Sequence, residues 1–284
     1  MTSFTYRIVN VFADAGAPQP KLTGNPLCVF EDARGMDERT QQALALQFNL
    51  SETVFVLPSD KATARIRIYT PSYEMPFAGH PTLGASHVIR ACLGAGDSFT
   101  LETGAGVIPV HASGDDWTLQ AKPPQTRALA QSNEAFAAMM GLHTSDLRES
   151  PLWVNTGSDQ LVAPLASVDA VRRARPDPVG IATLAQVDAA PKVFAWAESG
   201  NGEVLARFFL LKHGALLEDY GTGSAAANLG GWFVARGAKL PLKRLISQGE
   251  PIGRPARLLL EVDAQSGIHV SGRVIELGMG SVTL

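Results

Sequence analysis

The run PFAGHPTLG at residues 76–84 is the strongest structural signal in the sequence, because it leads from a strand signal directly into the start of a helix. His80 is followed by Pro81, a residue favoured in the first turn of a helix, and Gly94 supplies a stop signal. Between them, apolar side chains recur with helical spacing at Ala85, Val88, Ile89 and Cys92. The stretch therefore predicts a helix from about His80 to the residue before Gly94, with this stripe buried against a sheet.

Strand signals surround this helix in the first half of the chain. Alternating or continuous apolar runs predict strands at residues 6–12, 27–30, 54–57, 64–69, 98–102, 107–111 and 117–121. A further helix is expected from Asp37, a favourable N-cap residue, to Phe48. The polar, proline-containing residues 122–127 that follow are expected to form a linker.

The second half repeats the first in outline. Residues 218–226 (EDYGTGSAA) align with residues 74–82 (EMPFAGHPT), and each block follows a strand signal and opens a helix. The strand at residues 204–211 corresponds to that at 64–69, and a helical segment at 167–175 to the helix after Gly35. The pattern predicts an α+β protein of two similar domains, residues 1–121 and 128–272. The C-terminal strand, residues 273–284, is expected to complete the first domain.

Composition excludes several classes of function. The chain has 284 residues, 45% of them hydrophobic, a formal net charge of −3 and no basic block, so nucleic acid is not an expected partner. No apolar run approaches the roughly 20 residues needed to span a bilayer, so no membrane partner is expected. The N-terminus enters a strand pattern at once, which argues against a signal peptide. Cys28 and Cys92 have apolar neighbours and are interpreted as buried thiols in the cytoplasm.

Two glycine-containing helix starts, one in each half, carry a chemical implication. A helix N-terminus offers unpaired backbone N–H groups and a partial positive charge. Gly79 and Gly223 let the backbone approach a ligand closely. Two such ends would bind a carboxylate and stabilise the enolate-like charge left when a proton departs from the neighbouring carbon.

These blocks resemble a known family. The runs TGNPL at residues 23–27, NLSET at 49–53 and PFAGHPTLG at 76–84 are similar in order and spacing to signature blocks of the PhzF-like family of phenazine biosynthesis. Residues 218–225 resemble its last block. The resemblance implies the diaminopimelate-epimerase-like fold, in which two pseudo-symmetric domains each wrap a sheet around a central helix and the active site lies between them. It also implies a cofactor-independent isomerase of biosynthesis that acts on a small carboxylate.

The resemblance assigns roles to individual residues. Glu52 matches the family's general acid/base, and Asp219 matches an acidic residue that helps hold the substrate. His80 and Ser224 stand at the helix starts where racemases of this fold carry paired cysteines. Gly79, Thr222, Gly223 and Ser224 are the expected substrate-binding residues, with Glu52, His80 and Asp219 as the catalytic set. The pair Tyr220 and Gly221 departs from the family's usual Pro-Ala, so the resemblance does not identify the substrate.

Other interpretations stay open beside this one. The chain could be an epimerase or racemase of the same fold, or a non-catalytic protein that binds small molecules, and a homodimer is a possible assembly. Residues 221–226 formally match the dinucleotide fingerprint G-x-G-x-x-A, which functions only directly after a strand and with an acidic residue about 20 positions on. Because the preceding strand is expected to end near Leu211 and residues 239–244 are basic, no nicotinamide or flavin is expected. No Cys/His spacing suggests a metal.

Overall fold

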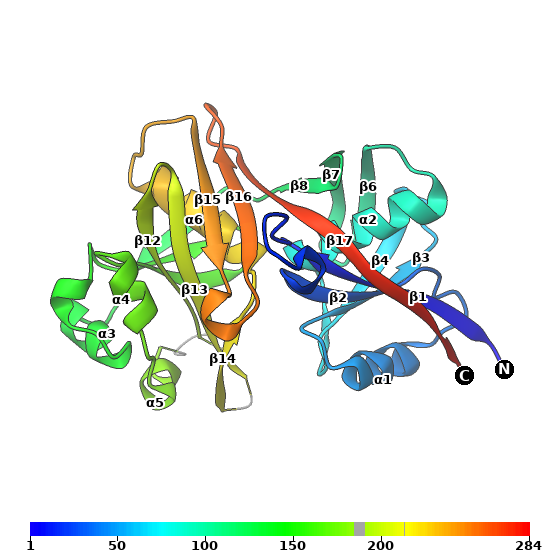
Figure 1. Ribbon diagram of the computed structural model, residues 1–284, viewed down its shortest axis with the longest axis horizontal. Helices are drawn as coiled ribbons and strands as arrows, with labels where there is room; N and C mark the ends of the chain where they lie inside the picture. The colour runs from blue at the N-terminus through cyan, green and yellow to red at the C-terminus, as the bar shows by residue number, and fades with distance from the viewer. Residues whose placement is uncertain (185–190, 213) are drawn as a thin grey trace. The chain divides into compact units, whose positions relative to one another are not determined.

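The computed structural model describes residues 1–184, 191–212 and 214–284 (Figure 1). By contacts it divides into two compact units. Unit 1 comprises Met1–Gln120 together with Ser271–Leu284, and unit 2 comprises Ala121–Val270. The two ends of the chain meet within unit 1, where Thr2 and Leu284 exchange backbone hydrogen bonds.

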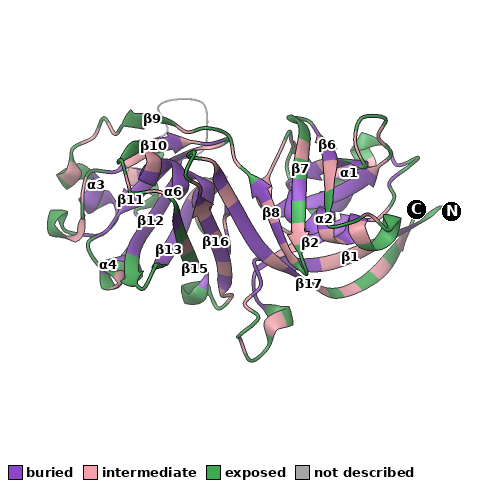
Figure 2. Cartoon of the chain, turned by 90° about the horizontal axis from the view of Figure 1, so that it is seen from above, coloured by how far each residue is buried: buried purple, intermediate pink, exposed green. Residues whose placement is uncertain are grey.

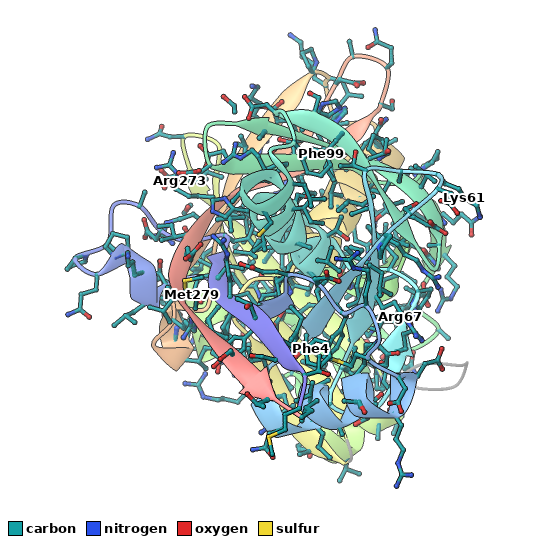
Figure 3. All side chains as sticks on the ribbon, turned by 90° about the vertical axis from the view of Figure 1, so that its right-hand side faces the viewer. Phe4, Lys61, Arg67, Phe99, Arg273 and Met279 are labelled. Carbon is teal, nitrogen blue, oxygen red and sulfur yellow. The ribbon has the colours of Figure 1, made fainter. Side chains whose placement is uncertain are left out.

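Unit 1 is a mixed sheet that closes on itself. In chain order its elements are β1 (Ser3–Val11), β2 (Asn25–Phe30), α1 (Glu38–Phe48), β3 (Thr53–Leu57), β4 (Ala64–Tyr69), β5 (Glu74–Met75), α2 (Gly79–Leu93), β6 (Ser98–Thr103), β7 (Gly106–Ser113), β8 (Asp116–Gln120) and the part of β17 (Ile268–Thr283) that follows Val270. The strands pair in the order β1, β2, β3, β4, β6, β7, β8, and β17 joins β8 back to β1. The pairing of β1 with β17, which carry the labelled Phe4 and Met279, can be followed in Figure 3.

Helix α2 fills the inside of this ring and packs against β1, β2, β3, β4 and β8. Gly84 makes the close approach possible, because a Cβ there would lie only 2.5 Å from Leu27 of β2 and 2.9 Å from Val11 of β1. On the outer face, α1 covers a second apolar cluster that includes Phe30, Phe55 and Tyr69. Alternating positions of one strand therefore serve two different cores, one inside the ring and one beneath α1.

Unit 2 uses the same kinds of element. They are β9 (Gln125–Ala128), α3 (Asn133–Met139), β10 (Leu152–Asn155), β11 (Asp159–Pro164), α4 (Val168–Arg173), α5 (Pro178–Ala182), β12 (Lys192–Gly200), β13 (Glu203–Lys212), β14 (Ala215–Asp219), α6 (Gly223–Ala235), β15 (Leu242–Gln248) and β16 (Ala256–Val262). Helix α6 is almost wholly buried and packs on β9, β10, β11 and β16. Figure 2 shows buried positions along α6 and the neighbouring strands β12 and β13.

The pairing pattern of unit 1 recurs in unit 2. In unit 1, β2 and β3 are parallel, β3, β4 and β5 are antiparallel in turn, and β6 returns parallel to β4 after α2. In unit 2, β11 and β12 are parallel, β12, β13 and β14 are antiparallel in turn, and β15 returns parallel to β13 after α6. Tyr69 lies opposite Glu74 and Phe209 lies opposite Glu218, so the registers also agree. His80 and Ser224 consequently hold the same place, second residue of the central helix.

Two expectations from the sequence are wrong. Cys92 is exposed rather than buried, as are all of residues 91–94 at the end of α2, and its sulfur accepts a hydrogen bond from the Arg7 side chain of β1. Residues 122–127 are not a free linker, since part of this stretch belongs to β9, which pairs with β10. There the guanidinium of Arg127 donates two hydrogen bonds to Asp159 and lies over the ring of Trp153. The predicted strands, the helix capped by Asp37 and the helix ended by Gly94 are confirmed.

No helix among the described residues is both long and apolar enough to cross a membrane.

Candidate active site

In unit 1 the structure brings Glu52 and His80 together. Glu52 Oε2 lies 3.2 Å from His80 Nδ1, and their side chains are 17% and 6% exposed. The two residues come from different elements: Glu52 directly precedes β3, and His80 is in the first turn of α2. The carboxylate and the imidazole are therefore in polar contact at the start of the central helix.

Local sequence explains why Glu52 faces the central helix. Asn49 ends α1 in the left-handed conformation, with φ of 52°, so the chain turns and β3 begins at Thr53. Along β3, Phe55 belongs to the outer cluster beneath α1. Because side chains alternate along a strand, Glu52 lies on the face opposite to that of Phe55. The face that carries Glu52 is the one that packs on α2.

Both side chains have polar atoms that no described residue satisfies. Glu52 Oε2 and His80 Nε2 are buried without a hydrogen-bond partner among the described residues, since the contact between Oε2 and Nδ1 lacks the geometry of a hydrogen bond. Buried polar groups are nearly always paired in folded proteins. An unpaired oxygen and an unpaired ring nitrogen on adjacent side chains are therefore suited to meet polar groups of a ligand.

The starts of the two central helices share a second feature. In the described part of the chain, α1, α3, α4 and α5 each have a side chain that caps the first turn, from Asp37, Ser132, Ser167 and Asp177. Helices α2 and α6, whose N-cap residues are Ala78 and Thr222, have no side-chain cap. First-turn N–H groups that no side chain occupies can instead bind an anion.

In unit 2, Thr222 is turned away from its helix. A threonine at the N-cap ordinarily accepts a hydrogen bond from the first turn, whereas here its Oγ1 donates to Asp219 Oδ2 at 2.5 Å. Gln248, at the end of β15, completes the group. Its Oε1 accepts from the Thr222 backbone N–H at 3.1 Å, and its Nε2 donates to Thr222 Oγ1 at 3.0 Å and to the Asp219 carbonyl at 2.9 Å.

The second residue of α6 is held by another network. Ser224 Oγ accepts a hydrogen bond of 2.8 Å from Gln160 Nε2, and Asn228 Nδ2 donates to Gln160 Oε1 at 3.0 Å. Asn228 Oδ1 in turn accepts from the backbone N–H and the hydroxyl of Thr156. Gln160 and Asn228 are 1% and 0% exposed. The network fixes the orientation of Ser224 where unit 1 carries His80.

The expected site residues thus form one group in each unit. Unit 1 brings Glu52 and His80 together at the start of α2, where Gly79 is the first residue of the helix. Unit 2 brings Asp219 and Thr222 together before α6, where Gly223 and Ser224 are the first two residues. Three buried residues of these groups were not predicted from the sequence: Gln160, Asn228 and Gln248. The one available signal was Asn228, a polar residue one turn after Ser224 in an otherwise apolar helix.

The structure also bears on cofactors and metals. Strand β13 ends at Lys212, close to the expected Leu211, but the additional strand β14 ends at Asp219, so a strand does precede residues 221–226 closely. β14 pairs antiparallel with β13, however, while the dinucleotide fingerprint belongs to a parallel βαβ unit. Within the described residues, no three His, Cys, Asp or Glu side chains are grouped to hold a metal ion.

Comparison with known proteins gives these groups a context. Residues 9–278 match the model of the PhzC-PhzF family, described as phenazine biosynthesis-like protein. An uncharacterised isomerase of Pasteurella multocida is 38% identical over 286 residues, covering 99% of this chain and 95% of that protein. The trans-2,3-dihydro-3-hydroxyanthranilate isomerase of Pseudomonas aeruginosa is 34% identical over 275 residues, covering 92% and 94%.

A solved structure agrees with these relatives. The Bacillus anthracis phenazine biosynthesis protein of the PhzF family superposes with a TM-score of 0.85 at 25% identity, with all of both chains covered. The match of the family model over nearly the whole chain, the relatives named isomerases and the shared fold lead to one conclusion. The chain is an isomerase and belongs to the phenazine biosynthesis-like PhzC-PhzF family.

Proposed function

We propose that the protein is a cofactor-free isomerase that moves a proton on a small carboxylate metabolite, with Glu52 as the proton carrier. The observation that carries the proposal is the contact between Glu52 and His80 at the start of α2, which offers a buried, unpaired carboxylate oxygen and a buried, unpaired ring nitrogen. A carboxylate with this limited exposure is suited to accept a proton from carbon and to return it.

The reaction is a proton transfer with no other reactant. The Glu52 carboxylate removes a proton from a carbon alpha or vinylogous to the substrate carboxylate, and the C–H electron pair moves into the conjugated system. The negative charge that develops on oxygen is stabilised by backbone N–H groups at an uncapped helix start. The Glu52 carboxyl group then returns the proton to another carbon, so atoms and charge balance.

His80 is proposed to assist Glu52 in this proton transfer and not to carry the proton itself. Its Nδ1 is close enough to Glu52 to orient the carboxylate, while its Nε2 is left for the substrate. A racemase that uses two thiols would need cysteines at the starts of α2 and α6, where this chain has His80 and Ser224. Cys28 belongs to the apolar cluster beneath α1, and burial raises the pKa of its thiol. The residues at these positions therefore favour a mechanism with one carboxylate over a mechanism with two thiols.

The substrate proposed first is trans-2,3-dihydro-3-hydroxyanthranilate, because a relative 34% identical is named for its isomerisation. The experiment incubates the protein with this compound in heavy water and follows deuterium incorporation by NMR and mass spectrometry. Enzyme-dependent exchange at carbon supports proton transfer, and a shifted double bond identifies isomerisation. Binding without exchange would contradict the proposal and favour a non-catalytic binding protein.

A further inference from the structure

We propose that Gln248 is a positioning residue which, through the Thr222 hydroxyl, holds the Asp219 carboxylate as a hydrogen-bond acceptor at the start of α6. The proposal rests on the function proposed above in one respect only, namely that Asp219 binds a substrate. Its structural content concerns the direction of the hydrogen bonds that join the three side chains.

The direction follows from one unambiguous donor. A backbone N–H can only donate, so the Gln248 atom 3.1 Å from the Thr222 nitrogen must be the carbonyl oxygen Oε1. The other end of the amide is then the NH2 group, which donates to Thr222 Oγ1 and to the Asp219 carbonyl. The amide orientation is thus fixed by its partners, as assignment of a glutamine requires.

The hydroxyl of Thr222 completes the sequence. Since Oγ1 accepts from Gln248, its single proton is available for the remaining close neighbour, Asp219 Oδ2 at 2.5 Å. Hydrogen bonds therefore run in one direction, from Gln248 to Thr222 to Asp219. Asp219 is therefore held as a hydrogen-bond acceptor at the start of α6.

Packing makes this arrangement rigid. Gln248 is fully buried. The next residue, Gly249, has φ of 78° and lies against the carbonyl oxygens of Tyr220 and Arg254, so that a Cβ there would come within 2.5 Å of the Tyr220 oxygen. The Arg254 backbone N–H closes the loop on Gly249 with a bond of 3.0 Å. The loop after β15 is consequently fixed against the segment between β14 and α6.

The arrangement also accounts for the uncapped start of α6. Thr222 could cap its helix, but its hydroxyl is committed to Asp219 and its backbone N–H to Gln248. Gln248 thus has two effects: it aligns Asp219 and it keeps the Thr222 hydroxyl away from the first-turn N–H groups of α6.

Near-isosteric substitutions test the relay. Gln248→Glu retains the oxygen that accepts from the Thr222 N–H but replaces the donor NH2 with a second acceptor, so the Thr222 hydroxyl should turn towards residue 248. Thr222→Val removes the hydroxyl, and Thr222→Ser restores it. Gln41→Glu is the matched control, because Gln41 is also buried, 1% exposed, and its Nε2 donates to the Met36 carbonyl in unit 1.

The first readout needs no substrate. A hydroxyl proton held by a half-buried carboxylate at 2.5 Å should give a slowly exchanging resonance, assigned by its absence in Thr222→Val. We expect this resonance in the wild type and in Gln41→Glu, and a large shift or loss in both Asp219→Asn and Gln248→Glu. A Thr222 proton that is unchanged in Gln248→Glu would overturn the proposal.

The second readout uses trans-2,3-dihydro-3-hydroxyanthranilate turnover. Gln248→Glu and Thr222→Val should raise KM by about tenfold with kcat within threefold, and Thr222→Ser should stay within twofold of the wild type. The double variant of Gln248→Glu with Asp219→Asn should have the same KM as Asp219→Asn alone, because Gln248 acts through Asp219. Fully additive effects would overturn the proposal. A wild type that does not turn over this compound refutes the proposed substrate, and the proton resonance still decides the relay.

Discussion

Arg207 of β13 holds the position in unit 2 that Arg67 of β4 holds in unit 1. Arg207 donates two hydrogen bonds to Glu218 of β14, and Arg67 donates two to Glu74 of β5 (Figure 3 labels Arg67). Each guanidinium also lies over the ring two residues further along its strand, Phe209 at 4.6 Å and Tyr69 at 5.3 Å. The repeat thus preserves an ion pair that fixes the short strand leading into each central helix.

The two ion pairs differ in burial, which gives a matched stability prediction. Arg207 and Glu218 are 7% and 10% exposed, whereas Glu74 is 38% exposed. Glu218→Gln should lower the free energy of unfolding by about 3 kcal/mol, because it leaves a buried guanidinium charge without its partner. Glu74→Gln should cost at most about 1 kcal/mol, because Glu74 itself is exposed and Arg67, 12% exposed, keeps Glu38 as a second partner. Urea unfolding of both variants measures the difference, and equal losses would show that burial does not decide the contribution.

A side-chain cap on α2 should improve stability and impair binding. Ala78 has the extended backbone of an N-cap residue but no capping side chain. Ala78→Asp should stabilise the helix by about 0.5–2 kcal/mol. The new carboxylate would occupy the N–H groups proposed for the substrate anion, so KM should rise by about tenfold or more. Ser132→Asp at the cap of α3 is the control, and it should leave KM unchanged. Unchanged KM in Ala78→Asp would argue against an anion at the start of α2.

His87 should make stability depend on pH. It lies in α2 with Nδ1 3.8 Å from Asp115, and burial lowers its pKa below the usual value of 6.5 despite that carboxylate. Because the folded-state pKa is the lower one, the unfolded chain binds the proton more readily as pH falls through about 6.5, and stability is lost below it. His87→Gln should reduce the drop in urea midpoint between pH 8 and pH 5.5. An equal drop in wild type and variant would exclude a contribution from His87.

Much of the candidate site could be predicted because it depends on local signals. Pro81 and Gly94 mark the ends of α2, and the position of Glu52 before an apolar strand places it on the inner face by simple alternation. The resemblance to the family then identified Glu52 and His80 together, and the structure gives the distance between them, 3.2 Å.

The parts that were missed depend on pairing between distant segments. Gln248 meets Thr222 and Asp219 from 26 and 29 residues away, and only the parallel pairing of β13 with β15 brings these segments together. Residues 122–127 looked polar enough for a linker, but Arg127 reaches Asp159, 32 residues away, and the strand forms around that contact. Helical periodicity predicted which face of α2 is apolar but not that its last turn, residues 91–94, is exposed, so the predicted burial of Cys92 was wrong.

Glu52 is the centre of the proposed chemistry, and a conservative substitution isolates its proton. Glu52→Gln keeps the size of the side chain and a polar group near His80 but cannot carry a proton to or from carbon. Turnover should fall by about 10²–10⁴-fold, the range for loss of a general acid/base, with little change in ligand affinity. Glu102→Gln is the matched control, since Glu102 is a carboxylate of the same unit with similar exposure, 20%, and bonds Ser59 outside the site.

The most direct test is the rate of deuterium incorporation from heavy water into trans-2,3-dihydro-3-hydroxyanthranilate, measured side by side for the wild type, Glu52→Gln, Asp219→Asn and Glu102→Gln. We predict exchange by the wild type and Glu102→Gln at similar rates, weaker exchange by Asp219→Asn that recovers at high substrate concentration, and a loss of at least 10²-fold in Glu52→Gln at every concentration. Near-normal exchange by Glu52→Gln together with no exchange by Asp219→Asn would contradict the account and make Asp219 the base.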